Sequence, residues 1–329
     1  MISTVLLFFQ VTGSQSMLRP AGQGAARISV LGWIVFITLL VVAFIMWIIV
    51  AWIGLRRRGS FDIKPPYDPQ GGQDWILSGG FIVPFIVLTV LFVLGLDTLS
   101  KFPMGAAADP PNPDIVVVGH QWWWEIRYHD GPVSDYFTTA NEIHIPVHRM
   151  VNIELLSGDV IHSFWIPRIH GKEDTIPGQP NYIRIEANKV GIYRGQCAEF
   201  CGDQHAHMGM LLVAQTQSDY DKWVAGQQLP CATPITPDAQ AGEQVFLHAA
   251  CVLCHRVRGT LAGGTVAPDL THIGSRMSLA ADTLTNDKAS LEAWITHAQS
   301  FKPGCQMPDI TQFNGVQLRQ LTAYLQQLK

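Results

Sequence analysis

The sequence predicts a multidomain membrane protein with a transmembrane hairpin, a β-sandwich and a C-terminal helical domain. Three observations predict this fold class: two long uncharged apolar runs near the N-terminus, several short β-type runs after them, and the motif C-V-L-C-H at 251–255. The 329 residues suffice for two or three domains. A net charge of −4 gives no reason to expect a nucleic-acid partner.

Two segments are apolar enough to cross a bilayer. Residues 28–55 and 75–96 contain no charged side chain, and roughly 20 apolar residues span the hydrocarbon core as a helix. Pro84 lies inside the second run, where a bilayer helix tolerates a kink. The sequence therefore predicts two membrane spans, with the lipid bilayer as a partner.

Basic residues predict how this hairpin is oriented. Positive charge favours the cytoplasmic side, and the segment between the spans carries Arg56, Arg57, Arg58 and Lys64. We therefore expect the large C-terminal part to lie outside the cytoplasm. The first eleven residues, MISTVLLFFQV, are similar to the apolar core of a signal peptide.

From about residue 114 the pattern becomes β-like. Short runs rich in Val, Ile, Tyr and Trp are broken by Gly, Pro, Asn and Asp: DIVVVGHQWWWEIRY, NEIHIPVHRMVNIELLS and PNYIRIEANKVGIYRG. Such runs favour a sandwich or a barrel. A loop rich in Cys and His follows the last run, so a rigid scaffold is expected to hold it at one end of the sheet.

That loop, GQCAEFCGDQHAHMG at 195–209, contains many side chains that can bind metal. Cys197 and Cys201 could form a disulfide, because exported cysteines often pair. With two histidines they could bind zinc, and with Met208 they form a soft ligand set that suits copper. The thioether favours copper. DVIHSFWIP supplies a second imidazole, His162, beside His205, while alternation should direct His207 elsewhere.

A second redox module follows a segment rich in Pro, Ala, Gln and Thr. Thr236 or Asp238 is the expected N-cap of its first helix, with Pro237 in the first turn. The motif C-V-L-C-H fits covalent attachment of a c-type haem through Cys251 and Cys254, with His255 on the iron. Met277 and Met307 are candidates for the sixth ligand, and the flanking Gly and Pro favour Met307.

The segments GHQWWWEIRY, DVIHSFWIPRIHGKEDTIPG and GQCAEFCGDQHAHMG closely resemble subunit II of the haem–copper cytochrome c oxidases. The resemblance covers roughly residues 28–225 and implies a cupredoxin-like Greek-key β-sandwich that binds a dinuclear copper centre, CuA. It implies that Cys197 and Cys201 bridge two copper ions. The other implied ligands are His162 and His205, one on each ion, Met208 as a weak ligand, and Glu199 through its backbone carbonyl.

The same resemblance implies two further roles. The Glu199 carboxylate would face a Mg²⁺ site shared with subunit I, and Trp122 would be an exposed ring through which electrons enter. GEQVF, TVAPDLTHIGSR and KPGCQMPDI resemble class I cytochromes c. They imply an all-α cytochrome c domain with one covalent haem c, bound by thioethers from Cys251 and Cys254 and by the axial ligands His255 and Met307.

Together the two resemblances imply a subunit of a respiratory, proton-translocating terminal oxidase. Electrons would pass from its fused haem c to CuA and on to haem in subunit I, which reduces oxygen. Subunits I and III, and cytochrome c or another periplasmic donor, are the expected partners. The expected location is the bacterial inner (plasma) membrane, with both redox domains on the periplasmic side. We expect an N-terminal segment 1–27, a hairpin 28–101, a CuA domain 102–225, a linker 226–238 and a cytochrome c domain 239–329.

Three other functions fit only part of the sequence. An enzyme like nitrous oxide reductase needs a further histidine-rich copper domain, and a quinol-oxidase subunit without copper would not keep the Cys, His and Met set. A non-redox copper carrier would not need a haem. Of the six cysteines, Cys231 and Cys305 are left over. They could pair and close a loop of about 75 residues, or stay as two free thiols.

Overall fold

A computed structural model describes residues 15–56, 69–102, 113–129 and 131–329. The chain divides into two compact units. One contains Met1–Ala26 and Met104–Lys329, and the other contains Arg27–Pro103. Arg57, Arg58, Lys64 and the candidate signal segment lie outside the described residues.

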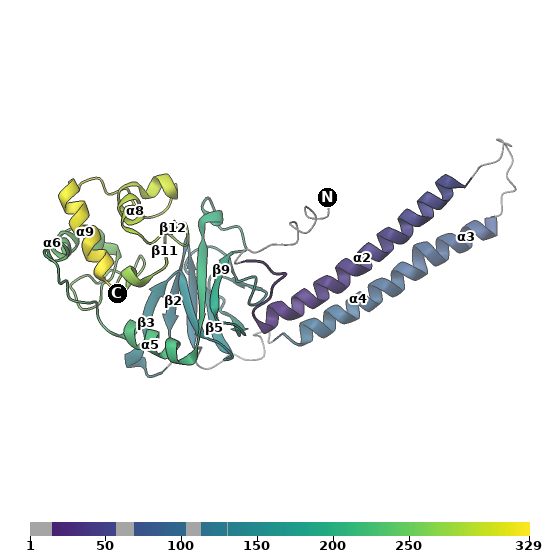
Figure 1. The fold of residues 1–329 in the computed structure, drawn as a ribbon, viewed down its shortest axis with the longest axis horizontal. Coiled ribbons are helices and arrows are strands. Elements are labelled where there is room, and N and C mark those ends of the chain that lie inside the picture. Colours follow the sequence, from purple (N-terminus) through teal and green to yellow (C-terminus); the bar gives the residue numbers. More distant parts are fainter. Residues whose placement is uncertain (1–14, 57–68, 103–112, 130) are drawn as a thin grey trace, which may run out of the picture. The chain divides into compact units, whose positions relative to one another are not determined.

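The smaller unit is helical. Its helices are α2 (Gln23–Leu55), α3 (Pro69–Leu77), the π-helix η1 (Ser78–Ile82) and α4 (Val83–Ser100) (Figure 1). The stretches 23–55 and 72–100 are long and apolar enough to cross a membrane. The Arg27 guanidinium donates to the carbonyl of Lys101, which joins the start of α2 to the end of α4. Two apolar helices were predicted here, and this is confirmed.

Pro84 produces a π-helical turn in the second span. A proline has no N–H to donate, and its ring clashes with the carbonyl four residues earlier. The helix accommodates this by widening into η1 immediately before Pro84, which occupies the first turn of α4. Such π turns are a common adjustment inside longer helices. The disturbance predicted at Pro84 therefore takes the form of a π turn.

The larger unit contains a β-sandwich of two sheets. One sheet has the order β3-β2-β1-β5-β8. Its strands are β1 (Ile115–His120), β2 (Trp123–Tyr128), β3 (Phe137–Ala140), β5 (Val151–Ser157) and β8 (Asn181–Ile185). Strands β1 and β5 are parallel, and the other neighbours are antiparallel. Side chains of β2 alternate between half-buried and buried, as expected for a strand with one face on a core.

The second sheet carries the cysteine loop. Its order is β4-β10-β9-β6-β7. The strands are β4 (Glu142–Pro146), β6 (His162–Trp165), β7 (Lys172–Thr175), β9 (Gly191–Cys197) and β10 (Gly209–Gln215). Between the sheets lies a core that includes Trp124, Tyr128 and Phe164, all fully buried. The cupredoxin-like sandwich is confirmed, and α5 (Gln217–Gln228) follows its last strand.

The C-terminal domain is helical, as predicted. It consists mainly of α6 (Pro237–Leu247), the one-turn α7 (Cys251–Cys254), α8 (Lys288–Phe301) and α9 (Gly315–Gln327), with a short ribbon of β11 (Ser278–Leu279) and β12 (Leu284–Thr285) (Figure 1). Thr236 caps α6 by accepting from Ala239 N, and Pro237 follows it, as the sequence indicated. Residues 229–236 separate α5 from α6, so both helices extend into the expected linker.

Helices α6 and α9 cross closely at Gly242. A Cβ atom at this position would lie 1.9 Å from the carbonyl oxygen of Gln320 on α9. Only glycine leaves room for the two backbones to approach this far. The contact buries Phe246, Leu321 and Tyr324 in the core of the domain.

The two spare cysteines are free thiols. Cys231 packs against the core of the helical domain, whereas Cys305 packs against the core of the sandwich. The disulfide hypothesis is therefore contradicted, because the two thiols belong to different packing clusters. Cys231 and Cys305 are instead two free thiols, which was the alternative prediction.

Candidate metal centre and haem site

Strand pairing brings the candidate copper ligands to one end of the second sheet. His162 begins β6 and Cys197 ends β9, and these strands are antiparallel with Phe164 opposite Cys197. The loop after Cys197 returns to β10, and Cys197 N donates to Met208 O at 3.0 Å. Gly202, with φ of +114°, turns the chain inside this loop. The sheet thus fixes both ends of the loop.

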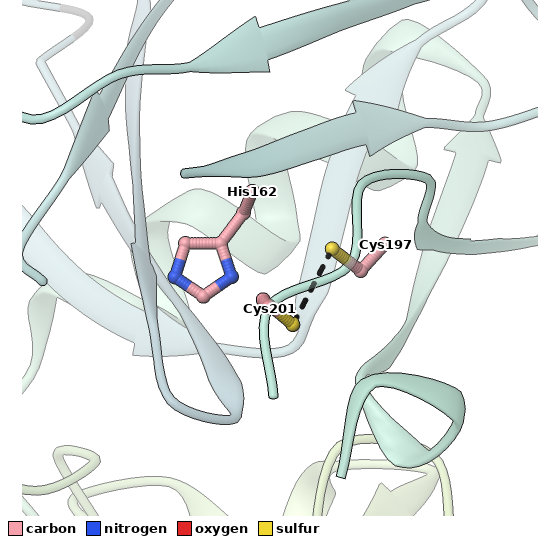
Figure 2. A group of neighbouring side chains, drawn as sticks. All are labelled: His162, Cys197 and Cys201. Atoms are coloured by element: carbon pink, nitrogen blue, oxygen red, sulfur yellow. Dashed lines mark hydrogen bonds between the residues drawn. The ribbon is translucent and has the colours of Figure 1, made fainter. Parts of the chain in front are cut away.

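Three donor side chains form a buried cluster. The ligand atoms of His162, Cys197 and Cys201 all lie within 4.8 Å of one another, and Figure 2 shows the imidazole beside the two sulfurs. The sulfurs are 3.8 Å apart, far from the roughly 2.05 Å of a disulfide bond. Cys197 and Cys201 therefore do not form a disulfide, and the zinc and copper interpretations of this loop remain.

The other expected ligands surround the same sulfurs. Cys201 Sγ lies 3.6 Å from His205 Nδ1 and 3.8 Å from Met208 Sδ. Cys197 Sγ lies 3.1 Å from the backbone carbonyl oxygen of Glu199, whose side chain is exposed. The structure thus brings together all the residues that the sequence marked as copper ligands. His207, by contrast, turns its Nδ1 to Gln204 Oε1 at 2.8 Å and stays out of the cluster.

Asp159 orients the His162 ring. Its carboxylate lies 2.7 Å from His162 Nε2. The other ring nitrogen, Nδ1, is buried and has no hydrogen-bond partner among the described residues. The ring nitrogen of a metal-bound histidine that does not bind the metal usually donates its N–H to a carboxylate in this way, which fixes the tautomer. Asp159 was not predicted as part of the site, although its place three residues before His162 was a signal.

The two thiols titrate as a pair. Contact with the Cys201 thiol lowers the pKa of Cys197 to about 3. Contact with Cys197, together with burial, raises the pKa of Cys201. Copper binds the thiolate form of cysteine, so metal binding to this pair would release protons. Two thiolates, imidazole and a thioether sulfur are a soft donor set, so these residues fit copper better than zinc.

The three consecutive tryptophans occupy different surroundings. Trp124 is fully buried in the sandwich core, and Trp123 stacks on His120 with ring centroids 4.6 Å apart. Trp122 is only 9% exposed, so the expectation that its ring is exposed is wrong. The ring packs into the sandwich core and has neighbours from two segments: a Cβ at Gly202 of the cysteine loop would lie 3.0 Å from Trp122 Cζ2, and a Cβ at Gly304 of the helical domain would lie 3.9 Å from Trp122 Cη2.

The haem-binding motif lies at the start of the helical domain. Cys251 and Cys254 begin and end α7, and both are free. His255 Nδ1 lies 2.8 Å from the carbonyl of Pro268, and burial lowers the pKa of His255. A neutral ring held in this way keeps its Nε2 lone pair for iron. These residues fit a covalent haem c.

The two candidate methionines differ in their packing. Met307 is half-buried and packs against the core of the helical domain. Met277 is 38% exposed, and its backbone N–H donates to Glu142 of the sandwich. An axial ligand must point into the haem-binding core, so the packing favours Met307.

Comparison with known proteins matches both redox domains. The family described as "Cytochrome C oxidase subunit II, periplasmic domain" matches residues 130–215, and "Cytochrome c" matches residues 239–329. The chain is 35% identical over 322 residues to cytochrome c oxidase subunit 2 of Alkalihalophilus pseudofirmus, covering 95% of this chain and 90% of the relative. The chain belongs to the cytochrome c oxidase subunit 2 family.

Other members of the family are similar over shorter stretches. Cytochrome c oxidase subunit 2 of Bacillus sp. (strain PS3) is 29% identical over 290 residues, covering 83% of this chain and 80% of the relative. A crystal structure of the periplasmic domain of subunit II (CoxB) of Bradyrhizobium japonicum is 29% identical and covers 35% of this chain and 93% of that chain, with a TM-score of 0.33.

Membership of the family defines the general activity. This subunit II is part of cytochrome c oxidase, a haem–copper oxidoreductase, and it carries a cytochrome c domain. The subunit II domain implies copper, and the cytochrome c domain implies haem. The apolar helices and the periplasmic-type domain describe a membrane protein with its redox part on the outer side.

Proposed function

We propose that this subunit II relays electrons from a haem c on its own C-terminal domain to a dinuclear CuA centre. From there they pass to haem in subunit I, where oxygen is reduced and protons are translocated. The observation that carries the proposal is the buried cluster of His162, Cys197 and Cys201, with ligand atoms within 4.8 Å of one another. Around it lie the other expected donors, Glu199, His205 and Met208.

Each donor has a role in this proposal. Cys197 and Cys201 would hold both copper ions, while His162 and His205 would each hold one of them. Met208 would be a weak ligand, and Glu199 would contribute its backbone carbonyl. When bound, the copper pair and the haem supply one-electron redox centres.

The protein around these donors suits electron transfer. Strand β9 and the loop closure between Cys197 and Met208 fix the backbone, and Asp159 fixes the ring of His162. Both thiols are buried, which excludes water. A site held in this way rearranges little when its charge changes, so it relays electrons rather than binding a substrate.

In the helical domain, Cys251 and Cys254 form the thioethers to the haem. His255, oriented by the carbonyl of Pro268, would bind the haem iron. Met307 would be the second iron ligand, and its packing against the domain core supports this role. Methionine in this position raises the reduction potential of the haem.

Further roles connect the subunit to its partners. The exposed Glu199 carboxylate contributes to a Mg²⁺ site shared with subunit I. Subunit III and a periplasmic donor, cytochrome c or another protein, complete the set of partners. The chain lies in the bacterial inner membrane, with a hairpin at 28–101, a CuA domain at 102–225 and a cytochrome c domain at 239–329 that follows the linker 226–238. Trp122 is the ring through which electrons reach the copper site.

Spectroscopy of the full-length protein tests the proposal. Purified in detergent with copper and haem loaded, it should show a near-infrared band, the multiline EPR signal of a mixed-valence copper pair and a c-type α-band. Cys197→Ser should abolish the copper signals and leave the haem band unchanged, because the haem residues lie in another domain. A parent protein with haem but no such copper signal would contradict the proposal.

A further inference from the structure

A buried lysine joins the helical domain to the loop at 195–209 that carries the candidate copper ligands (the copper loop). Lys302 follows the last residue of α8 and is only 3% exposed. Its Nζ donates to three backbone carbonyls: Trp122 O at 2.8 Å, His207 O at 2.8 Å and Ala280 O at 3.2 Å. An ammonium group has three hydrogens, so these three acceptors satisfy it completely.

The three acceptors belong to three separate segments. Trp122 lies between β1 and β2 of the sandwich, and His207 belongs to the copper loop, between His205 and Met208. Ala280 lies in the helical domain, in the turn between β11 and β12. A single charged group therefore ties the helical domain to both sandwich segments at the copper site.

We propose that Lys302 is a positioning residue for electron transfer, and that its ammonium group holds the methionine loop (residues 302–307) against Trp122 and the copper loop. The inference rests on the proposed function, since it concerns the relay between the two redox domains. It adds to that function the residue that fixes the distance between them.

Neighbouring contacts reinforce the same docking. Gln204 Nε2 in the copper loop donates to Pro303 O at 2.9 Å. Gly209 N, just after Met208, donates to Ala281 O at 3.0 Å. Arg194 Nε of β9 and Asp282 Oδ2 of the helical domain form an ion pair at 2.5 Å. These contacts surround Lys302, so the ammonium group lies within a continuous interface.

The turn at 280–282 is strained in a way that suits an interface. Ala280, Ala281 and Asp282 have φ values of 54°, 59° and 59°. Non-glycine residues avoid this left-handed region, and such strain persists where surrounding contacts fix it. Here each of the three residues contacts the interface: Ala280 O and Ala281 O accept hydrogen bonds, and Asp282 pairs with Arg194.

The docked loop covers the ring that leads to the copper ligands. Trp122 lies between Gly202 of the copper loop and Gly304 of the methionine loop. A Cβ atom added at Gly202 would lie 3.0 Å from the indole, and one added at Gly304 would lie 3.9 Å from it. Its Nε1 donates to the carbonyl of Cys201 at 3.0 Å. A continuous path of contacts thus runs from the methionine loop through Trp122 to Cys201. In this arrangement a diffusing donor does not reach Trp122, and electrons arrive from the chain's own haem domain.

The proposal is tested with Lys302→Met in the full-length, haem- and copper-loaded protein. Methionine keeps much of the side-chain volume but leaves three buried carbonyls without a donor. The matched control is Lys288→Met, at an exposed lysine that begins α8, the helix that Lys302 follows. Two quantities are measured: the rate of haem-to-copper electron transfer after photoreduction, and amide hydrogen exchange of 119–124 and 204–209 in copper-free protein.

We expect Lys302→Met to slow electron transfer roughly tenfold or more, since small displacements of positioned groups have large effects on rate. Amide exchange in both segments should become faster, while the haem and copper spectra and the Lys288→Met control match the parent. If Lys302→Met does not fold, Asp282→Asn replaces it. Asparagine tolerates positive φ but removes the charge pair with Arg194, so the same changes should appear to a smaller extent.

The outcomes separate the inference from the proposed function. If the parent shows both spectra but no haem-to-copper transfer, the proposed function fails, and hydrogen exchange alone decides whether Lys302 docks the domains. Parent-like transfer in Lys302→Met overturns the positioning role, whether or not exchange changes.

Discussion

The indole Nε1 of Trp122 donates a hydrogen bond to the backbone carbonyl of Cys201 at 3.0 Å. This bond links an aromatic ring at the domain interface to a candidate copper ligand. The same carbonyl also accepts from Gln121 Nε2 at 2.8 Å, so it keeps a partner if the indole is changed. The contribution of the indole can therefore be tested without leaving a buried acceptor unpaired.

Trp122→Phe should slow haem-to-copper electron transfer while copper stays bound. The variant keeps an aromatic ring but loses the Nε1 donor, a change worth about 1 kcal/mol or about fivefold in rate. Photoreduction kinetics measure the effect. Trp123→Phe is the control, because Trp123 stacks on His120 and makes no such bond. Equal rates in both variants would remove Trp122 from the path.

Asp159→Asn should weaken copper binding. The Asp159 carboxylate holds His162 at 2.7 Å, and loss of such a partner typically reduces metal affinity 10–100-fold. Titration against a copper chelator measures the affinity. Asp174→Asn on the neighbouring strand β7 is the control and should bind copper as the parent does. An unchanged affinity in Asp159→Asn would show that the carboxylate does not orient the ligand.

Glu125 should make the sandwich sensitive to acid. Burial alone would raise the pKa of Glu125, but hydrogen bonds to His120 and Arg127 lower it to about 2. Because the folded-state pKa lies below the ordinary value of 4.5 for a glutamate, the stabilisation is present above about pH 4.5 and is lost as the pH falls towards 2. The lost stability is on the order of 2 kcal/mol.

Unfolding of metal-free protein, followed by tryptophan fluorescence between pH 5 and 2, measures this dependence. Glu125→Gln should flatten the curve relative to the parent over that pH range, since glutamine does not titrate. Parallel curves for the two proteins would mean that Glu125 does not carry the acid sensitivity.

Gly242→Ala should destabilise the haem domain. The added Cβ would lie 1.9 Å from Gln320 O, and forcing α6 and α9 apart costs about 1–3 kcal/mol. Gly226→Ala is the control, because a Cβ at Gly226 meets nothing within 4 Å. It lies in α5, where alanine is favoured over glycine by up to about 1 kcal/mol. Thermal unfolding of the two variants should therefore shift in opposite directions, and a shift in the same direction would contradict this account of the crossing.

The candidate copper ligands of the loop could be found in the sequence because they are local. Cys197, Cys201, His205 and Met208 lie in one short loop, so their spacing is visible without the fold. His205 and His207 lie in the 3-10 helix η4 and not in a strand, so alternation is not the reason that His207 stays out of the cluster. The α6 cap at Thr236 was predictable for the same reason, since capping depends on neighbouring residues.

The domain interface could not be predicted in this way. Lys302 reaches Trp122 across 180 positions and His207 across 95. Both acceptors are backbone carbonyls, so no side-chain pattern marks them. The burial of Trp122 could not be predicted for the same reason: one of its neighbours, Gly304, lies far along the chain in the helical domain. The family resemblance indicated an exposed ring at this position.

The most direct test of the central claim is the metal content and EPR spectrum of the full-length protein. The account predicts twice as much copper as haem iron, with the multiline signal of a copper pair that disappears in Cys197→Ser. Zinc in place of copper, or copper without the paired signal, would contradict the account and limit the electron-transfer role of this chain to its haem domain.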